Sequence, residues 1–339
     1  MYRKRKFAKK VFINVASLVL AAVLLLAGNQ YLDNRLDLPP LPKNVTQTVS
    51  DAVSGILDAA GDIVDSLYQK ADLAQAKTDA QGNLLVHFID VGQGDCELIQ
   101  APEANVLIDA GDVGEGDLVV DYLKAQGVER IDYLLATHPH ADHIGGMPEV
   151  VEAFEIGKVL FSDVPADLIP TTKIYEQLLD SIAGKGLKIT KASPGIAYDL
   201  GDGAMLKILA PLNQDQEDLN ENSIVCRLDF GETSFLFTGD AGISSENDMI
   251  KRYGSALSGT VLKLGHHGSN TATQEKWLNR VNPKIVVAEV GADNKYGHPH
   301  KEILQRIKER GLTFYRTDRD GTIVMASDGG DITVTAEKE

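Results

Sequence analysis

Residues 137–143 place three histidines and a carboxylate together, directly after an apolar run, in the order Thr-His-Pro-His-Ala-Asp-His. Imidazole and carboxylate groups are the usual ligands of catalytic divalent metals. Because alternate residues of an extended segment point the same way, His138 and His140 can share one ion. The tight turn that follows would direct Asp142 and His143 at a second ion. The segment therefore predicts a pair of neighbouring metal sites.

The other residues able to bind metal or to move protons also follow predicted strands. They are Asp109, Asp240, His266, His267, His298 and His300. Seven of the eight histidines are thus in strand-to-loop positions. The eighth, His87, lies inside a predicted strand, and we interpret it as structural.

From residue 84 onward, short strands alternate with helices. Strands and hairpins in both halves, with helices between them, predict two mixed sheets covered by helices. We therefore expect one α/β (α+β) domain over residues 84–339. The predicted strands are 84–90, 96–100, 106–110, 131–137, 159–161, 205–210, 224–230, 234–238, 261–264, 285–290 and 321–326. The predicted helices are 118–126, 172–183, 246–253, 274–281 and 301–309.

The N-terminus predicts a membrane anchor within residues 1–30. Residues 1–10 hold six basic side chains and no acid, and residues 11–28 carry no charge, which is just long enough to span a bilayer. A cleaved signal peptide would need small residues before the cleavage point, and the end of this run fits poorly. It also resembles a lipoprotein signal, but Asn29 stands where the lipidated cysteine would be. We therefore expect a single-pass helix with a cytoplasmic N-terminus and an extracellular remainder.

Residues 31–83 predict a spacer and a short helical stalk. Residues 38–42 are rich in proline and form a stiff, extended segment. Apolar residues at heptad spacing then mark an amphipathic helix over residues 49–67. This helix could join two chains weakly, or dock on the membrane or on the main domain, but ordinary packing explains the same pattern.

The charge of the chain beyond the anchor argues against a general grip on long nucleic acid. The 33 basic residues include the six near the start, so residues 31–339 hold 27 basic against 49 acidic residues, a net charge of −22. Proteins that hold long nucleic acid without sequence preference are normally basic on at least one face. A local basic groove would still be compatible with this balance.

Six segments in chain order resemble motifs of the metallo-β-lactamase superfamily. They are 88–95, 137–146, 237–241, 266–269, 296–300 and 316–321. Within that superfamily they are most similar to the exterior hydrolase domain of ComEC-type competence proteins, which take up DNA. The resemblance covers nearly all of residues 84–327. It implies a four-layer αβ/βα sandwich with the metals at one edge, between the two sheets.

The resemblance also implies a ligand set. His138 and His140 would bind the first divalent metal, and Asp142 and His143 would bind the second. Asp240 would bridge both metals, because a carboxylate has two oxygens.

One further histidine, His266 or more readily His267, would complete the second metal site, and the other could face a substrate oxygen. The first site departs from the superfamily pattern, since residues 144–265 contain no histidine. Asn220 or Asn222 could supply an oxygen there instead. An oxygen-richer site shifts the preference from Zn²⁺ toward Mn²⁺ without deciding between them.

These residues predict hydrolysis by a water that two divalent cations activate. Asp142 can hold the remaining proton of that water, while His266, His298 or His300 can protonate the leaving group or bind a phosphoryl oxygen. By resemblance, phosphodiesters or phosphomonoesters fit best as substrates, with DNA among them. Small-molecule esters, lactones, lactams and thioesters are hydrolysed by the same core and stay open.

Two aspartates are expected to support the ligands. Asp109 follows a strand before a glycine, where a carboxylate commonly fastens the turn and orients a ligand histidine. Asp90 and Asp95 flank a glycine-rich turn, and either could bond backbone amides or touch substrate. We group Asp90 with Asp109 among the supporting residues.

A non-catalytic envelope module is the competing interpretation. Such a protein would keep one structural metal and bind a partner through its stalk. A structural metal site needs only four ligands, all supplied by the protein, with no coordination position left open. The chain offers a larger set, which favours the hydrolase: His138, His140, Asp142, His143, Asp240 and His267.

Overall fold

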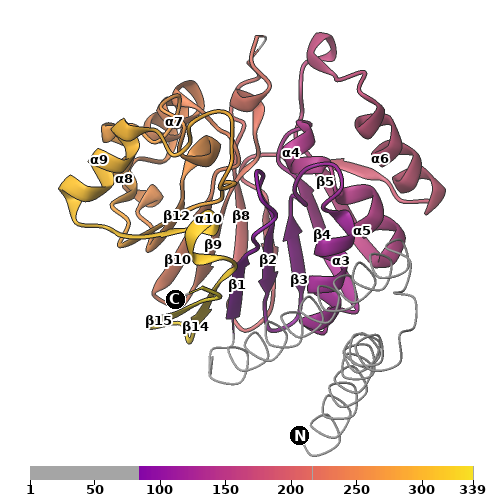
Figure 1. The fold of residues 1–339 in the computed structure, drawn as a ribbon, viewed down its shortest axis with the longest axis horizontal. Helices are drawn as coiled ribbons and strands as arrows, with labels where there is room; N and C mark the ends of the chain where they lie inside the picture. The colour runs from indigo at the N-terminus through magenta and orange to yellow at the C-terminus, as the bar shows by residue number, and fades with distance from the viewer. Residues whose placement is uncertain (1–83, 216, 339) are drawn as a thin grey trace, which may run out of the picture. The chain divides into compact units, whose positions relative to one another are not determined.

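The computed structural model describes residues 84–215 and 217–338, and these form two β-sheets packed face to face between two layers of helices (Figure 1). The first sheet has eight strands in the order β15-β14-β1-β2-β3-β4-β5-β6, and the second has seven in the order β13-β12-β11-β10-β9-β8-β7. This arrangement confirms the predicted four-layer αβ/βα sandwich.

The first sheet is mixed. Strand β1 pairs antiparallel with β14 and β2, whereas β3 to β6 run parallel. Leu84, Val86 and Phe88 of β1 point into the core between the sheets, so the alternation of this strand places its apolar face inward. The strands are β1 Leu84–Phe88, β2 Glu97–Gln100, β3 Asn105–Ile108, β4 Arg130–Ala136, β5 Glu155–Phe161, β6 Ile189–Lys191, β14 Ile323–Ser327 and β15 Ile332–Ala336.

The second sheet is also mixed. Strands β7 to β10 are antiparallel, and β10 to β13 are parallel. Phe235 and Phe237 of β10 stack with their ring centroids 6.4 Å apart in the core between the sheets. The strands are β7 Ala197–Asp199, β8 Met205–Ala210, β9 Val225–Phe230, β10 Thr233–Phe237, β11 Val261–Lys263, β12 Ile285–Ala288 and β13 Thr313–Arg316.

Helices cover the outer face of each sheet. Helices α3, α5 and α6 pack on the first sheet, and α7, α8 and α9 pack on the second (Figure 1). In α3, Val119, Val120 and Leu123 lie on one face at helical spacing and are buried against the sheet. The α-helices are α3 Gly116–Ala125, α4 Ala141–Ile144, α5 Met147–Ala153, α6 Lys173–Gly184, α7 Ile243–Tyr253, α8 Glu275–Val281, α9 Lys301–Arg310 and α10 Thr317–Asp320. The short 3₁₀ turns are η1 Ala166–Leu168, η2 Asn220–Asn222, η3 Gly254–Leu257 and η4 Gly265–Gly268.

All five predicted helices are present, with ends within a few residues of the expected ones. Helix α5 and the strands β6, β7, β13 and β15 were not predicted. Each of these missed elements has at most seven residues, and β15 alternates between half-buried and exposed positions at the edge of its sheet. A short element at an edge gains its stability from neighbouring strands, so its own sequence carries little signal.

Within residues 84–215 and 217–338, no helix is long and apolar enough to cross a bilayer. The predicted anchor within residues 1–30 and the predicted stalk in residues 31–83 lie outside the described residues.

Candidate metal centre

The predicted ligands lie in loops that follow strands of both sheets. His138 follows β4 of the first sheet, while Asp240 follows β10 and His267 follows β11 of the second. The edge where these strands end therefore gathers side chains that are about a hundred residues apart in sequence. Their ligand atoms form small groups in which all atoms lie within 4.8 Å of one another.

The loop after β4 has the local structure that its sequence predicts. His140 is extended (φ −76°, ψ 151°), and the short helix α4 begins at the next residue and carries Asp142 and His143. The neighbouring loop approaches this helix closely at Gly94, where an added Cβ would lie 2.3 Å from the carbonyl oxygen of Asp142. Only glycine permits that approach.

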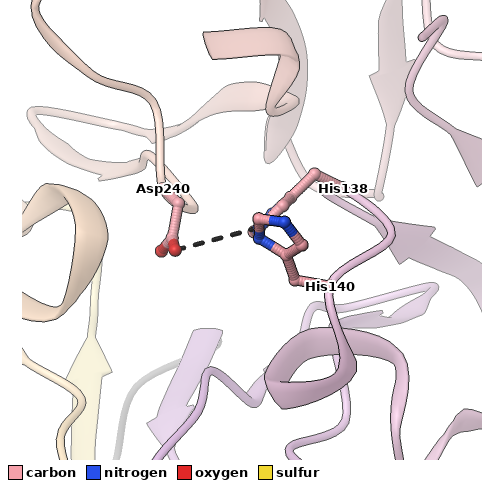
Figure 2. A group of neighbouring side chains, drawn as sticks. All are labelled: His138, His140 and Asp240. Atoms are coloured by element: carbon pink, nitrogen blue, oxygen red, sulfur yellow. Dashed lines mark hydrogen bonds and ion pairs between the residues drawn. The ribbon is translucent and has the colours of Figure 1, made fainter. Parts of the chain in front are cut away.

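The first group consists of His138, His140 and Asp240. The His138 Nε2 lies 2.9 Å from the His140 Nδ1 and 3.8 Å from the Asp240 Oδ2. Figure 2 shows Asp240 facing His138, with His140 beside that histidine. The two histidines that the alternation assigned to one ion thus do share one group.

The second group consists of Asp142, His143 and His267. The His267 Nε2 lies 3.4 Å from the Asp142 Oδ2, and the His143 Nε2 lies 4.0 Å from the Asp142 Oδ1. The structure therefore places His267, and not His266, in this group.

Asp240 reaches both groups with different oxygens. Its Oδ1 lies 3.4 Å from the His143 Nε2 and 3.5 Å from the His267 Nε2. Its Oδ2 faces His138 of the first group. This is the geometry that a bridging carboxylate requires.

The donor atoms fit a divalent cation. Among the described residues, the His143 Nε2, the His267 Nε2 and the Asp240 Oδ1 are buried without a hydrogen-bond partner. Buried polar atoms almost always have a partner, and three that converge on one point are costly to leave unpaired. A cation between them would satisfy all three at once. Imidazole with carboxylate suits Zn²⁺ and Mn²⁺ alike.

Asp109 orients one of the ligands, as its position after a strand predicts. Its Oδ2 accepts hydrogen bonds from the His143 Nδ1 (2.7 Å) and the Thr137 hydroxyl (2.5 Å), and its Oδ1 accepts from the Thr137 amide (2.8 Å). These bonds hold the His143 ring so that its Nε2 faces the group.

Asp95 contacts the Nδ1 atoms of two ligand histidines, and Lys263 pairs with Asp95. The sequence did not predict this supporting role for either residue. The Asp95 carboxylate lies 3.2 Å from the His267 Nδ1 and 3.7 Å from the His143 Nδ1, and it forms an ion pair with Lys263. Lys263 also donates to the carbonyl oxygen of Gly239 (3.1 Å), next to Asp240. The sequence did contain a signal for this pair, because a lysine inside an apolar strand needs a buried partner.

The charges at this pair reinforce the support. Burial acts to raise the pKa of Asp95, but the Lys263 ammonium and the His267 ring lower it to about 2. Burial acts to lower the pKa of Lys263, but the carboxylates of Asp95 and Asp240 raise it above its ordinary value. Asp95 is therefore ionised and Lys263 is charged at neutral pH.

His266 and His298 line the approach to the groups. His266 adopts a left-handed backbone (φ 50°), uncommon for a side chain other than glycine, and its Nε2 lies 3.5 Å from the Asp240 Oδ2. His298 packs against it, with ring centroids 5.5 Å apart. Burial and the neighbouring histidines lower the pKa of His298 to about 4, so this ring is neutral at neutral pH. It can donate or accept a hydrogen bond there, but it is a weak candidate for a proton donor.

His300, predicted to be catalytic, contacts the backbone of two loops. Its Nδ1 accepts a hydrogen bond from the Asn270 amide (2.9 Å), and its Nε2 lies 3.2 Å from the carbonyl oxygen of Tyr296. Both ring nitrogens therefore have backbone partners in this structure, and the catalytic role of His300 stays a prediction.

Asn222, the predicted oxygen ligand of the first metal, has its side-chain amide engaged within its own loop. Its amide nitrogen donates to the carbonyl oxygens of Asp215 (3.0 Å) and Asp218 (2.8 Å), and its amide oxygen accepts from the Asp215 backbone (3.0 Å). The side chain therefore shapes the loop before β9. Asn220 contributes to the turn η2 in the same loop.

Asp90 ties down its own turn and the end of the chain, which corrects its grouping with Asp109. Its carboxylate accepts from the Gly92 amide (3.2 Å) and pairs with Lys338 (3.1 Å). Neither contact reaches a ligand of the groups.

The charges around His267 make metal binding depend on pH. Burial acts to lower the pKa of this imidazole, but the carboxylates of Asp240 and Asp95 outweigh it and raise the pKa to about 10. A metal binds only the neutral imidazole, so at neutral pH the ion must displace a proton.

We therefore expect the apparent affinity for Zn²⁺ or Mn²⁺ to rise about tenfold per pH unit for each displaced proton, between about pH 6 and 8. Competition titrations at several pH values measure this slope. Calorimetry in buffers of different ionisation enthalpy counts the protons released. The His267→Asn variant should show a shallower slope, and an affinity of the native protein that stays constant over this range would contradict the prediction.

Comparison with known proteins identifies similar sequences. Residues 89–288 match the family model described as the metallo-beta-lactamase superfamily. The chain is 28% identical over 257 residues to ComE operon protein 3 of Bacillus subtilis, covering 70% of this chain and 32% of that protein. It is 32% identical over 235 residues to the competence protein ComA of Neisseria gonorrhoeae, covering 69% of this chain and 31% of that protein.

The chain spans 26% to 32% of the length of the curated relatives that it matches. Among solved structures, a metallo hydrolase from the archaeon Ignicoccus hospitalis aligns with a TM-score of 0.44 at 16% identity, covering 74% of this chain and 98% of that chain.

Proposed function

The chain belongs to the metallo-beta-lactamase superfamily, and from this membership and the ligand geometry we propose that it is a metal-dependent hydrolase that cleaves phosphodiesters outside a membrane. The observation that carries this proposal is the shared carboxylate of Asp240, which reaches two ligand groups at once. Two adjacent cations are the usual apparatus for displacement at a phosphoester.

Asp240 and Asp142 have different roles at the site. When bound, two divalent cations would supply an activated water and neutralise charge on the substrate oxygens. Asp240 is buried between the groups and fixes their spacing. Asp142 is a quarter exposed, and its Oδ2 faces the His267 Nε2. Burial acts to raise the pKa of Asp142, but His267 lowers it below the ordinary carboxyl value, so this carboxylate is ionised and can accept a hydrogen bond from the attacking water.

His266 is placed to bind a substrate oxygen. Its side chain is a quarter exposed, and its Nδ1 lies 2.9 Å from the Thr271 hydroxyl. Burial lowers the pKa of His266, so the ring is neutral at neutral pH. With Nδ1 facing the Thr271 hydroxyl, Nε2 is the ring nitrogen that can form a hydrogen bond with the substrate.

The substrate class rests on the relatives. One relative is named a competence protein and another a recombination protein, which supports a phosphodiester, with DNA among the candidates. The acidic balance of the chain favours short substrates over a long polyanion that would need a basic track.

We also propose that the domain is held at the cell membrane. The uncharged run over residues 11–28 would be a single-pass anchor with its basic flank in the cytoplasm. The heptad-spaced segment over residues 49–67 would then form a stalk, through which two chains could associate weakly.

The decisive experiment uses the full chain purified in detergent. Its metal content is measured by elemental analysis, and it is tested with Zn²⁺ and Mn²⁺ on a dinucleotide, single-stranded and duplex DNA, a lactone and a lactam. We expect at least one metal per chain and hydrolysis of the phosphodiesters.

The Asp142→Ala variant separates this activity from a contaminant. It should lower phosphodiester hydrolysis at least about a hundredfold, because one ligand oxygen of the second group and the hydrogen-bond acceptor for the attacking water are lost. The Asp112→Ala variant, at an exposed position outside both groups, should remain active. Less than one metal per chain with no hydrolysis would indicate the non-catalytic envelope module, and hydrolysis of the lactone or lactam alone would indicate a small-molecule hydrolase.

A further inference from the structure

An exposed tyrosine stands at the entrance to the metal centre. Tyr296 lies in the loop between β12 and α9 and is 63% exposed, the highest value among the large exposed hydrophobic side chains of the described residues. A single exposed hydrophobic side chain is ordinary at a protein surface, and what distinguishes Tyr296 is the series of ring contacts that connects it to the second ligand group.

Three rings form a ladder from this tyrosine to the second ligand group. The Tyr296 ring stacks on His298 with centroids 5.5 Å apart and an angle of 22° between the planes. The His298 ring stacks in turn on the ligand His267, at 6.2 Å and 25°. The Tyr296 ring is thus connected to the ligand His267 through one intervening ring, and each successive pair of rings is close to parallel.

The loop that carries the tyrosine is held by many bonds. The Asn294 side chain donates to the carbonyl oxygens of Gly291 (2.9 Å) and His298 (2.9 Å) and accepts from the His298 amide (2.9 Å). His300 bonds the Tyr296 carbonyl oxygen on one side and the Asn270 amide on the other. The exposed ring is therefore presented by a fixed backbone, and a ligand that stacks on it loses little to ordering the loop.

We propose that Tyr296 is a base-binding residue, on whose open face a nucleobase of the phosphodiester stacks while the phosphate lies at the metal groups. Nucleobases are planar, and each has a π-face that stacks on an aromatic side chain whatever its sequence. The inference rests on the proposed function, since it places the phosphate at the groups shared by Asp240. It assigns the substrate class as short nucleotide phosphodiesters, one of whose bases the protein recognises without sequence preference.

The test compares two diesters with the full chain loaded with Mn²⁺ or Zn²⁺. One is the dinucleotide thymidylyl-thymidine, and the other is the same diester with tetrahydrofuran in place of both nucleosides. We expect the base-bearing diester to have a KM about tenfold lower, as base stacking on an aromatic side chain predicts. Tyr296→Leu should abolish this difference by raising the KM of the dinucleotide about tenfold, with its kcat and the abasic KM changed less than about twofold. Tyr296→Phe keeps a ring and should retain the preference.

Ile189→Ala is the matched control, because Ile189 is also a large exposed side chain (42% exposed) but begins β6, an edge strand of the other sheet. It should leave both diesters unaffected. The base-binding role is wrong if Tyr296→Leu raises the KM of both diesters equally, or if the native protein has the same KM for both. Either result would leave the proposed hydrolysis intact.

Binding separates this role from catalysis. Calorimetry with thymidine 5′-monophosphate should show about tenfold weaker binding in Tyr296→Leu than in the native protein. If neither diester is cleaved but this difference is found, hydrolysis fails and the base-binding role stands. If the nucleotide does not bind the native protein, the base-binding role is wrong.

Discussion

Replacing Asp240 with alanine should lower the metal content from about two ions per chain to less than one and reduce hydrolysis at least about a thousandfold. The reason is that its two oxygens serve both groups, Oδ1 facing His143 and His267 and Oδ2 facing His138. Burial acts to raise the pKa of Asp240, but the histidines hold it well below the ordinary carboxyl value, so the group is ionised and available to cations.

Elemental analysis and steady-state kinetics on the full chain measure the two effects. Asp229→Asn is the matched control, because this carboxylate lies on the neighbouring strand β9 but pairs with Lys207 (2.9 Å) and Arg227 (2.7 Å) instead of the ligands. Retention of two metals by Asp240→Ala would show that the groups do not share this carboxylate.

Replacing Lys263 with methionine should lower the free energy of unfolding by about 3–5 kcal/mol, the usual cost of removing one partner of a buried ion pair. Lys263 and Asp95 are both fully buried, and Glu97 and Glu289 are buried close by. Without the ammonium, the Asp95 carboxylate would stay in the interior and lose its ion-pair partner. Methionine keeps most of the volume, so the change reports charge more than packing.

Denaturant unfolding of the full chain measures this loss. Lys191→Met is the control, since Lys191 pairs with Asp163 at the surface and is 58% exposed, and its loss should cost less than about 1 kcal/mol. A loss no larger in Lys263→Met than in the control would contradict a charged pair in the core.

The pH dependence of this loss has a defined sign. In the native protein the pKa of Asp95 is lowered to about 2, so its ionised form contributes stability at neutral pH that is lost as the pH falls through about 2. In Lys263→Met the pKa of Asp95 should rise, because burial is no longer opposed by the ammonium. The carboxyl then takes up a proton as the pH falls toward about 4, and the difference from the native protein should shrink there.

Local sequence patterns predicted which side chains lie together where neighbours in sequence are also neighbours in space. The alternation of His138 and His140 and the turn to Asp142 and His143 are properties of seven consecutive residues, and the extended backbone and helix α4 reproduce them. Asp109 was predictable for a similar reason, because a carboxylate at the end of a strand lies beside the end of the next parallel strand.

Other side chains could not be assigned from sequence, because their partners come from distant elements. Asn222 and His300 have suitable chemistry for a metal site, yet the side chain of each forms hydrogen bonds with backbone groups of its surrounding loops. Lys263 belongs to the second sheet and Asp95 to the loop after β1 of the first, so only the packing of the sheets makes them partners.

The sequence alone determined the layered architecture, the strand-end positions of the ligands and the division of the 137–143 loop between two groups. These follow from periodicity and short-range backbone geometry, which act within a few residues. The resemblance favoured His267 over His266 and a shared Asp240, and tertiary structure placed the atoms of these residues within reach of one another. Tertiary structure alone decided that Lys263 pairs with Asp95. Such choices depend on distances of a few ångströms between strands far apart in the chain, and only the packing of one sheet on the other sets them.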